Sequence, residues 1–142
     1  MKLKDIMTRS VVKIHHKESV GVAARMLTHY NIGVLPVCDG EGKLVGVVTD
    51  RDVVIRCVAS GRQPEKTKVC DIMTTRVISA SPDMDAAVAT HLMGREQVRR
   101  LPVVERGKLC GMVSLGDLAG NEETGYDAAD ALSEICGNLS PK

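Results

Sequence analysis

The 142-residue chain has very few aromatic side chains: it contains no Phe, no Trp and only two tyrosines, Tyr30 and Tyr126. Proteins that bind single-stranded nucleic acid stack the bases on aromatic rings, and this chain lacks the side chains for such a platform. The 19 basic and 18 acidic side chains leave a formal net charge of +1. The chain therefore has no strong positive electrostatic potential to attract nucleic acid or an anionic membrane, and the composition argues against both as partners.

Long apolar runs and paired cysteines are also missing. No stretch approaches the roughly 20 apolar residues of a membrane-spanning helix, and charges from Lys2 onward leave no apolar signal-peptide core. The five cysteines are scattered and form no C-x-x-C motif, which argues against a zinc site and a disulfide framework. Because four of the five lie in apolar contexts, we expect small, reduced core residues. These features predict a cytoplasmic protein.

Catalytic motifs are absent as well. The chain contains no G-x-x-x-x-G-K-[ST], no G-x-S-x-G and no Cys/His pair with a plausible third member. His15 and His16 are adjacent on a predicted strand exit, so they point to opposite sides and do not easily share a metal ion. We predict neither a catalytic site nor a metal site.

An internal repeat covers most of the chain. D-I-M-T at residues 5–8 returns at 71–74, L-P-V at 35–37 returns at 101–103, and G-K-L at 42–44 returns at 107–109. Three matched blocks in the same order indicate a duplication. We predict a first repeat at residues 1–60, a polar linker at 61–67, a second repeat at 68–120, and a tail at 121–142 that holds a loop and an amphipathic helix.

Each repeat predicts the element order β-α-β-β-α after a lead-in that carries D-I-M-T. The first strands are expected at residues 11–14 and 77–80, and Ser81-Pro82-Asp83 is expected to open the first helix of the second copy. Apolar positions at i, i+3, i+4 and i+7 predict one buried stripe on each first helix. These positions are Val20, Ala23, Ala24 and Leu27, and Ala86, Ala89, Thr90 and Met93.

Half the chain, at about sixty residues, would bury little apolar surface alone. We therefore predict an α/β (α+β) fold in which two small sheets pack against each other with pseudo-twofold symmetry. The amphipathic helix of the tail adds to this fold. It either covers core or contacts a second subunit.

The most informative stretch is L-V-G-V-V-T-D-R-D at residues 44–52, which returns as L-C-G-M-V-S-L-G-D at 109–117. Each copy predicts a buried strand, then a hydroxyl at a helix start, then an aspartate three residues later. This T/S-x-x-D spacing is typical of a capping box, which on spacing alone is the favoured interpretation. It also suits a nucleotide, because free N–H groups at a helix start bind phosphate and one carboxylate accepts both ribose hydroxyls. The two roles can coexist if the hydroxyl caps the helix and the aspartate stays free.

D-I-M-T, I-G-V-L-P-V at 32–37 and the stretch at 44–52 together resemble a CBS domain. V-R-R-L-P-V-V at 98–104 and G-M-V-S-L-G-D are similar, so the pair resembles a Bateman module over roughly residues 1–120. The resemblance implies regulatory binding of AMP, ADP, ATP or S-adenosylmethionine in clefts between the repeats, and pairing of modules into dimers. It favours the ligand-binding interpretation of T/S-x-x-D over the cap.

The resemblance also implies which residues form the two clefts, because T/S-x-x-D of one repeat faces the first strand and pre-proline loop of the other. The first cleft is expected to contain Thr49, Asp50, Arg51, Asp52, Val77, Ile78, Arg99, Arg100, Leu101 and Pro102. The second is expected to contain Val11, Val12, Ile32, Gly33, Val34, Pro36, Ser114 and Asp117.

The two predicted clefts differ in charge. Arg51, Arg99 and Arg100 would give the first cleft three guanidinium groups, which suit phosphate oxygens, whereas the motifs of the second carry no basic residue. We therefore predict that the first cleft prefers a phosphorylated nucleotide, and that the second is empty or takes a less charged adenosine derivative. The alternative is that Arg99 or Arg100 is simply solvated.

These observations predict a non-enzymatic adenine-nucleotide sensor that forms a homodimer and acts on an unidentified regulated protein. Ligand binding would change how the halves pack, and the partner would respond to that change. Two alternatives remain open: a ligand-free interaction or dimerisation module, and a small enzyme whose chemistry lies in the cleft.

Overall fold

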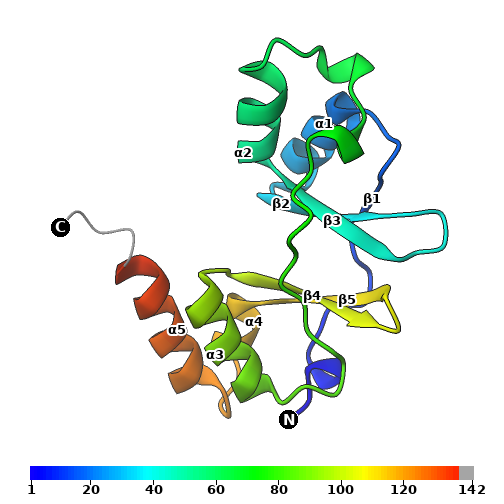
Figure 1. Cartoon of the computed structure of the whole chain (residues 1–142). Helices are drawn as coiled ribbons and strands as arrows, with labels where there is room; N and C mark the ends of the chain where they lie inside the picture. The colour runs from blue at the N-terminus through cyan, green and yellow to red at the C-terminus, as the bar shows by residue number, and fades with distance from the viewer. Residues whose placement is uncertain (138–142) are drawn as a thin grey trace. The chain divides into compact units, whose positions relative to one another are not determined.

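The computed structural model describes residues 1–137 and has the mixed α/β architecture that the sequence predicts (Figure 1). The strands are β1 (Ile14–His15), β2 (Val34–Cys38), β3 (Leu44–Thr49), β4 (Arg100–Glu105) and β5 (Lys108–Ser114). The helices are α1 (Val20–Tyr30), α2 (Asp50–Asp52), α3 (Ala86–Glu96), α4 (Leu115–Ala119) and α5 (Gly125–Gly137). A π-helical segment, η2 (Val53–Val58), continues α2, and single 3₁₀ turns lie at η1 (Leu3–Asp5), η3 (Pro64–Lys66) and η4 (Val69–Asp71).

The chain forms two compact units that do not follow the order of the repeats. Unit 1 combines Met1–Val11 with the chain from Ile78 onward, and unit 2 is Val12–Val77. Each unit therefore contains the body of one repeat and the lead-in of the other. The predicted repeat boundaries describe the duplication in the sequence, whereas the compact units cross them.

Backbone hydrogen bonds hold each lead-in in place. In unit 1, Thr8 and Met112 exchange N–H···O bonds of 2.8 and 2.9 Å, and in unit 2 Val47 and Thr74 exchange bonds of 2.9 and 2.8 Å. The repeated glycine of the third strand makes this approach possible. A Cβ at Gly46 would lie 2.8 Å from the Thr74 carbonyl oxygen, so only glycine lets the lead-in pack directly on the strand.

The sheets are small. In unit 2, β1 runs parallel to β2, which pairs antiparallel with β3, and in unit 1 β4 and β5 form an antiparallel pair. The expected first strands are shorter than predicted: β1 covers only Ile14–His15, and the stretch 77–80 makes a single parallel bridge from Ala80 to Val103. The reason is that residues 11–12 and 77–78 are where the chain leaves one unit for the other.

The predicted stripe of α3 is confirmed, since Ala86, Ala89, Thr90 and Met93 are all buried. In α1, Val20, Ala23 and Leu27 are buried and Ala24 is half-buried. The predicted start of α3 at Ser81-Pro82-Asp83 is wrong. Those residues form a turn in which Met84 N–H donates to the Ser81 carbonyl, and Asp85 caps the helix by accepting from Ala87 N–H at 2.9 Å.

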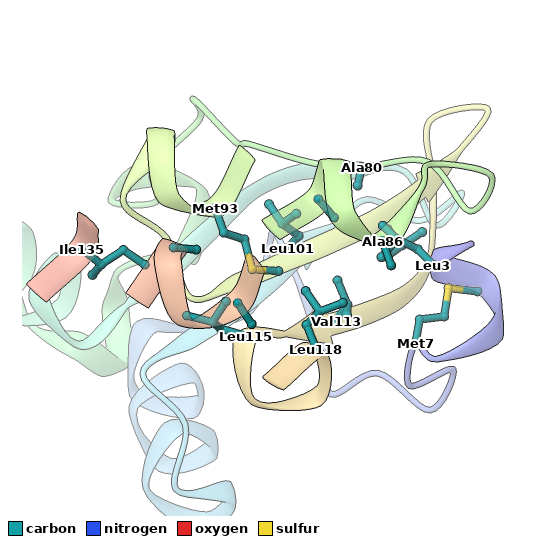
Figure 2. Packing of buried hydrophobic residues seen from close by; sticks show 14 residues of the cluster. Leu3, Met7, Ala80, Ala86, Met93, Leu101, Val113, Leu115, Leu118 and Ile135 are labelled. Carbon is teal, nitrogen blue, oxygen red and sulfur yellow. The ribbon is translucent and has the colours of Figure 1, made fainter. Parts of the chain in front are cut away.

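Each unit has its own hydrophobic core, so the apolar surface is buried within the units. In unit 1 the core extends from Leu3 and Met7 of the first lead-in, through β4 and β5, to Ala128, Ala131 and Ile135 of α5 (Figure 2). In unit 2 it includes Val69 and Ile72 of the second lead-in. The tail helix therefore covers core in unit 1, which the sequence left open. The last five residues of the predicted tail lie outside the described residues.

The cysteines are less buried than expected. Cys38 and Cys57 are core residues, but Cys70 and Cys110 are half-buried and Cys136 is exposed. Burial raises the pKa of the Cys38 and Cys110 thiols. Among residues 1–137, no helix is both long enough and apolar enough to cross a membrane.

Candidate functional site

Both T/S-x-x-D motifs form reciprocal capping boxes. In unit 2 the Asp52 N–H donates to Thr49 Oγ1 at 3.1 Å, and the Thr49 N–H donates to Asp52 Oδ2 at 3.0 Å. In unit 1 the corresponding Ser114–Asp117 distances are 3.1 and 2.9 Å. The cap that the spacing favours is therefore confirmed in both copies. A ligand-binding role for these residues stays a prediction.

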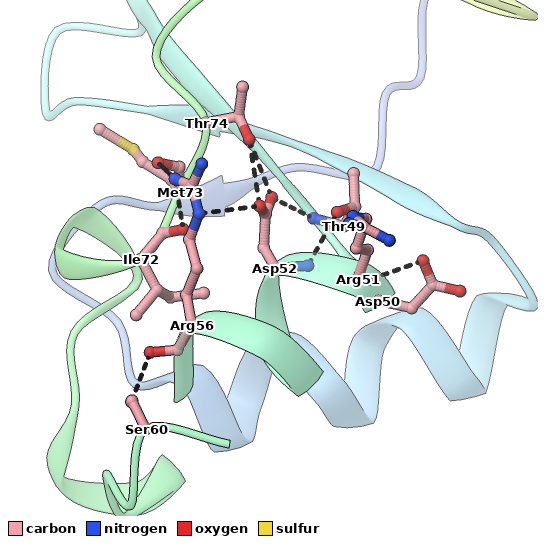
Figure 3. Close-up of polar contacts among 9 residues, drawn as sticks. All are labelled: Thr49, Asp50, Arg51, Asp52, Arg56, Ser60, Ile72, Met73 and Thr74. Atoms are coloured by element: carbon pink, nitrogen blue, oxygen red, sulfur yellow. Dashed lines mark hydrogen bonds and ion pairs between the residues drawn. The ribbon is translucent and has the colours of Figure 1, made fainter. Parts of the chain in front are cut away.

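In unit 2 the buried Asp52 carboxylate is also part of a side-chain network (Figure 3). The Thr74 hydroxyl donates to its two oxygens at 3.1 and 3.2 Å, and Arg56 Nε lies 3.7 Å from Oδ1. The residue is only 6% exposed. The expectation that this aspartate stays free is wrong, because its oxygens already accept bonds from the protein.

The same network joins the α2–η2 helix to the second lead-in. Arg56 Nη1 donates to the Met73 carbonyl at 3.2 Å, alongside the Thr74–Asp52 bonds (Figure 3). The Arg51 backbone N–H, at the helix start, donates to Asp50 Oδ1 at 2.9 Å. The Asp52 carboxylate is thus engaged by the protein, whereas within residues 1–137 the Arg51 guanidinium makes no hydrogen bond or ion pair and stays open to an anion.

The equivalent corner of unit 1 lacks these contacts. Thr8 corresponds to Thr74, yet within residues 1–137 its side chain makes no hydrogen bond to Asp117. Asn121 stands where Arg56 stands in the first copy, and its amide donates toward the sulfur of Met1. The Asp117 side chain is exposed as a result.

A pocket of ≈ 450 Å³ lies beside this corner, entirely within unit 1. Its walls come from the start of β4, the β5–α4 corner and α5. The lining residues are Arg99, Arg100, Ser114, Leu115, Gly116, Ala119, Gly125, Ala128, Ala129 and Leu132. Sheet pairing explains why the arginines are there: Arg100 is the register partner of Ser114, and the Leu115 N–H donates to the Arg99 carbonyl at 2.7 Å.

The pocket combines residues that the sequence assigned to different clefts, since Arg99 and Arg100 were expected in the first and Ser114 in the second. The other predicted residues are divided between the units. Of the first cleft, Thr49–Asp52 and Val77 belong to unit 2, and Ile78, Leu101 and Pro102 to unit 1. Of the second, Val11 and Asp117 belong to unit 1, and Val12, Ile32, Gly33, Val34 and Pro36 to unit 2.

Burial limits what some predicted residues offer a ligand. Pro36, Leu101 and Pro102 are buried, and Leu101 belongs to the unit 1 core. Sequence reasoning missed Thr74, whose recurrence in D-I-M-T was a signal, and the α5 residues Ala129 and Leu132, which had none. Over residues 1–137, no group of three or more His, Cys, Asp or Glu side chains lies close enough to hold a metal ion.

Comparison with known proteins defines the class. The CBS domain family matches residues 3–58 and 69–122, so the chain belongs to the CBS domain family. It is 38% identical over 133 residues to the CBS domain-containing protein YhcV of Bacillus subtilis, covering 94% of both chains.

Two solved structures are similar over most of the chain. Hypoxic Response Protein I, known from Mycobacterium tuberculosis, has a TM-score of 0.76 at 29% identity, covering 84% of this chain and 97% of that one, and its crystal structure holds two zinc ions. The CBS domain pair of protein MJ0100 has a TM-score of 0.69 at 26% identity, covering 99% of this chain and 98% of that one. That pair was crystallised in complex with 5′-methylthioadenosine and S-adenosyl-L-methionine.

Proposed function

We propose that this protein is a non-enzymatic regulatory module that binds an adenosine-containing ligand, with AMP, ADP or ATP foremost and S-adenosylmethionine as a further candidate. The observation that carries the proposal is the likeness over 99% of the chain to a CBS pair crystallised with two adenosyl ligands. Arginines beside an apolar pocket in unit 1 support an anionic member of this class. A ligand site in the cleft between the two repeats, with the residues assigned above, remains a prediction, as does a cytoplasmic location.

The link between the units suggests how such a ligand would be sensed. The second lead-in is bonded to unit 2 through Thr74 and Asp52 and continues into unit 1 at Ile78. A ligand would shift the equilibrium between two arrangements of this segment only by its difference in affinity for them. A regulated protein that recognises one arrangement would complete the sensor.

An exposed apolar face favours a homodimer and supports the second candidate, a dimerisation module. Val54, Ile55 and Val58 on η2 are 57%, 46% and 57% exposed. α5 packs on α4 in unit 1, whereas in unit 2 only the single 3₁₀ turns η3 and η4 follow η2. Exposed apolar side chains grouped on one short helix are typical of an interaction site. Sedimentation of wild type and Ile55→Asp tests it: the wild type is expected to be a dimer and the variant a monomer.

The experiment for the ligand is a thermal shift panel of AMP, ADP, ATP and S-adenosylmethionine, with GMP as the base control. A ligand at about 100 times its Kd stabilises the native state by about 2.7 kcal/mol, which raises the midpoint measurably. Mass spectrometry of small molecules released from freshly purified, denatured protein provides an independent readout.

Three results would contradict the proposal or redirect it. No shift with any adenosine ligand, together with no released adenosyl compound, would leave the dimerisation module as the function. Equal shifts with GMP and AMP would reject the adenosine specificity. Hydrolysis of ATP by the purified protein would support the enzyme alternative.

A further inference from the structure

The pocket in unit 1 has a wall that does not belong to the CBS repeats. The family match ends at residue 122, whereas α5 begins at Gly125 and contributes Ala128, Ala129 and Leu132 to the lining. The helix is held in place by Ala128, Ala131 and Ile135 in the core of unit 1. The pocket is therefore formed by the tail of the chain together with its second repeat.

The chemistry of the lining has two parts. The apolar surface comes from Leu115, Ala119, Ala129 and Leu132. Leu132, on α5, is 41% exposed. Arg99 and Arg100 provide positive charge. Within residues 1–137, Arg99 Nη2 lies 3.9 Å from the thiol sulfur of Cys136, and the Arg100 side chain makes no hydrogen bond or ion pair. This combination suits a ligand with a flat apolar body and an anionic group.

The available space depends on small residues. A Cβ at Gly116 would come no closer to a neighbour than 3.7 Å, to Ser114 Oγ, so the glycine leaves open space and is not required by packing. The corresponding residues of the first copy are larger: Arg51 for Gly116 and Val54 for Ala119. At ≈ 450 Å³ the pocket falls within the roughly 300–1,000 Å³ typical of small-molecule sites.

We propose that α5 forms one wall of a nucleotide pocket in unit 1, where the adenine lies against Ala129 and Leu132 and the phosphate is bound by Arg100 beside Arg99. This inference rests on the proposed function and specifies it: the second half of the chain holds a nucleoside monophosphate, and a helix outside the repeats contributes to the affinity. Asp52, with its carboxylate already engaged, acts as a structural residue of unit 2.

Calorimetric titration of the full chain with AMP and with adenosine tests the proposal. Ala129→Phe places a ring in the pocket from an exposed helix position, and we expect at least a tenfold loss of AMP affinity. Ser133→Phe adds the same ring to an exposed position of α5 outside the lining, and AMP affinity should stay at the wild-type value. Arg100→Ala should weaken AMP at least tenfold and leave adenosine affinity unchanged, because only the charged contact is lost.

The outcomes separate this inference from the proposed function. If the wild type binds AMP and Ala129→Phe binds it equally well, the α5 pocket is wrong while the adenosine sensor stands. If the wild type binds no adenosine compound, the proposed function itself fails. The comparison of AMP with adenosine in Arg100→Ala does not depend on Ala129→Phe folding, and unchanged AMP affinity in that variant would overturn the phosphate assignment.

Discussion

The two T/S-x-x-D corners of this protein have the same local structure and different surroundings. Thr49–Asp52 and Ser114–Asp117 make the same reciprocal cap, with distances that agree within about 0.1 Å. Asp52 is buried under Thr74 and Arg56, whereas Asp117 is exposed beside a pocket. A motif shared by two copies therefore defines a helix start, and the residues packed against it decide whether its carboxylate is a structural group or remains available to a ligand.

The tail helix is the second difference between the halves. α5 supplies three buried residues to the core of unit 1 and part of the pocket lining, and within the described residues unit 2 has no helix in the corresponding place. The two halves are thus similar frameworks, and unit 1 has an additional wall.

The largest effect is expected from removing the side chain that fixes this wall. Ile135→Ala should lower the free energy of unfolding of unit 1 by about 2–5 kcal/mol, because it leaves a cavity in a core where the residue is only 5% exposed. Hydrogen exchange resolved by peptide should report the loss in unit 1 and leave the core of unit 2 protected.

Leu132→Ala is the matched control on the same helix, since Leu132 is largely outside the core, and it should change stability by less than about 1 kcal/mol. Equal losses in the two variants would show that α5 is not anchored as described.

The comparison of the corners predicts unequal costs for the two aspartates. Asp52→Ala removes the carboxylate half of the capping box and leaves the Thr74 hydroxyl without its acceptor, for a loss of about 2–4 kcal/mol in urea unfolding. Asp117→Ala removes only the carboxylate half of the capping box on an exposed corner and should cost about 1 kcal/mol. Identical shifts in the unfolding midpoint would refute the structural distinction between the two corners.

A smaller difference in stability is expected between substitutions of the two lead-in threonines, Thr74 and Thr8. Thr74→Val keeps the shape of the side chain and removes its hydrogen bonds to a buried carboxylate, which should cost about 1–2 kcal/mol. Thr8→Val occupies the matching place in unit 1, where the side chain is exposed, and should stay within about 0.5 kcal/mol of wild type. A double-mutant cycle between positions 52 and 74 should show coupling, and additive effects would contradict the contact.

The sequence predicts the local elements well. The buried stripes of α1 and α3 and the L-P-V strands follow from periodicity and repetition, and their burial confirms them. Features that depend on distant parts of the chain could not be predicted in the same way. Gly46 and Gly111 stand inside the repeated strands, but nothing in the sequence identified the other repeat's lead-in as the neighbour that requires them.

The candidate site shows the same limit. Sequence reasoning recognised Arg99, Arg100 and Ser114 as site residues but assigned them to different clefts, because it relied on pairing between repeats. The antiparallel register of β4 and β5 places Arg100 opposite Ser114 within one sheet. The contribution of α5 depends on tertiary packing, which is encoded only in its general amphipathic pattern.

The most direct test of whether the nucleotide binds in unit 1 and not at the Asp52 corner is a titration of the ¹⁵N-labelled full chain with AMP, followed by amide chemical shifts. We predict that the largest changes fall on Gly116, Ala129 and Leu132, around the pocket of unit 1. Changes confined to Thr49–Asp52, with the amides of α5 unmoved at saturation, would contradict that prediction.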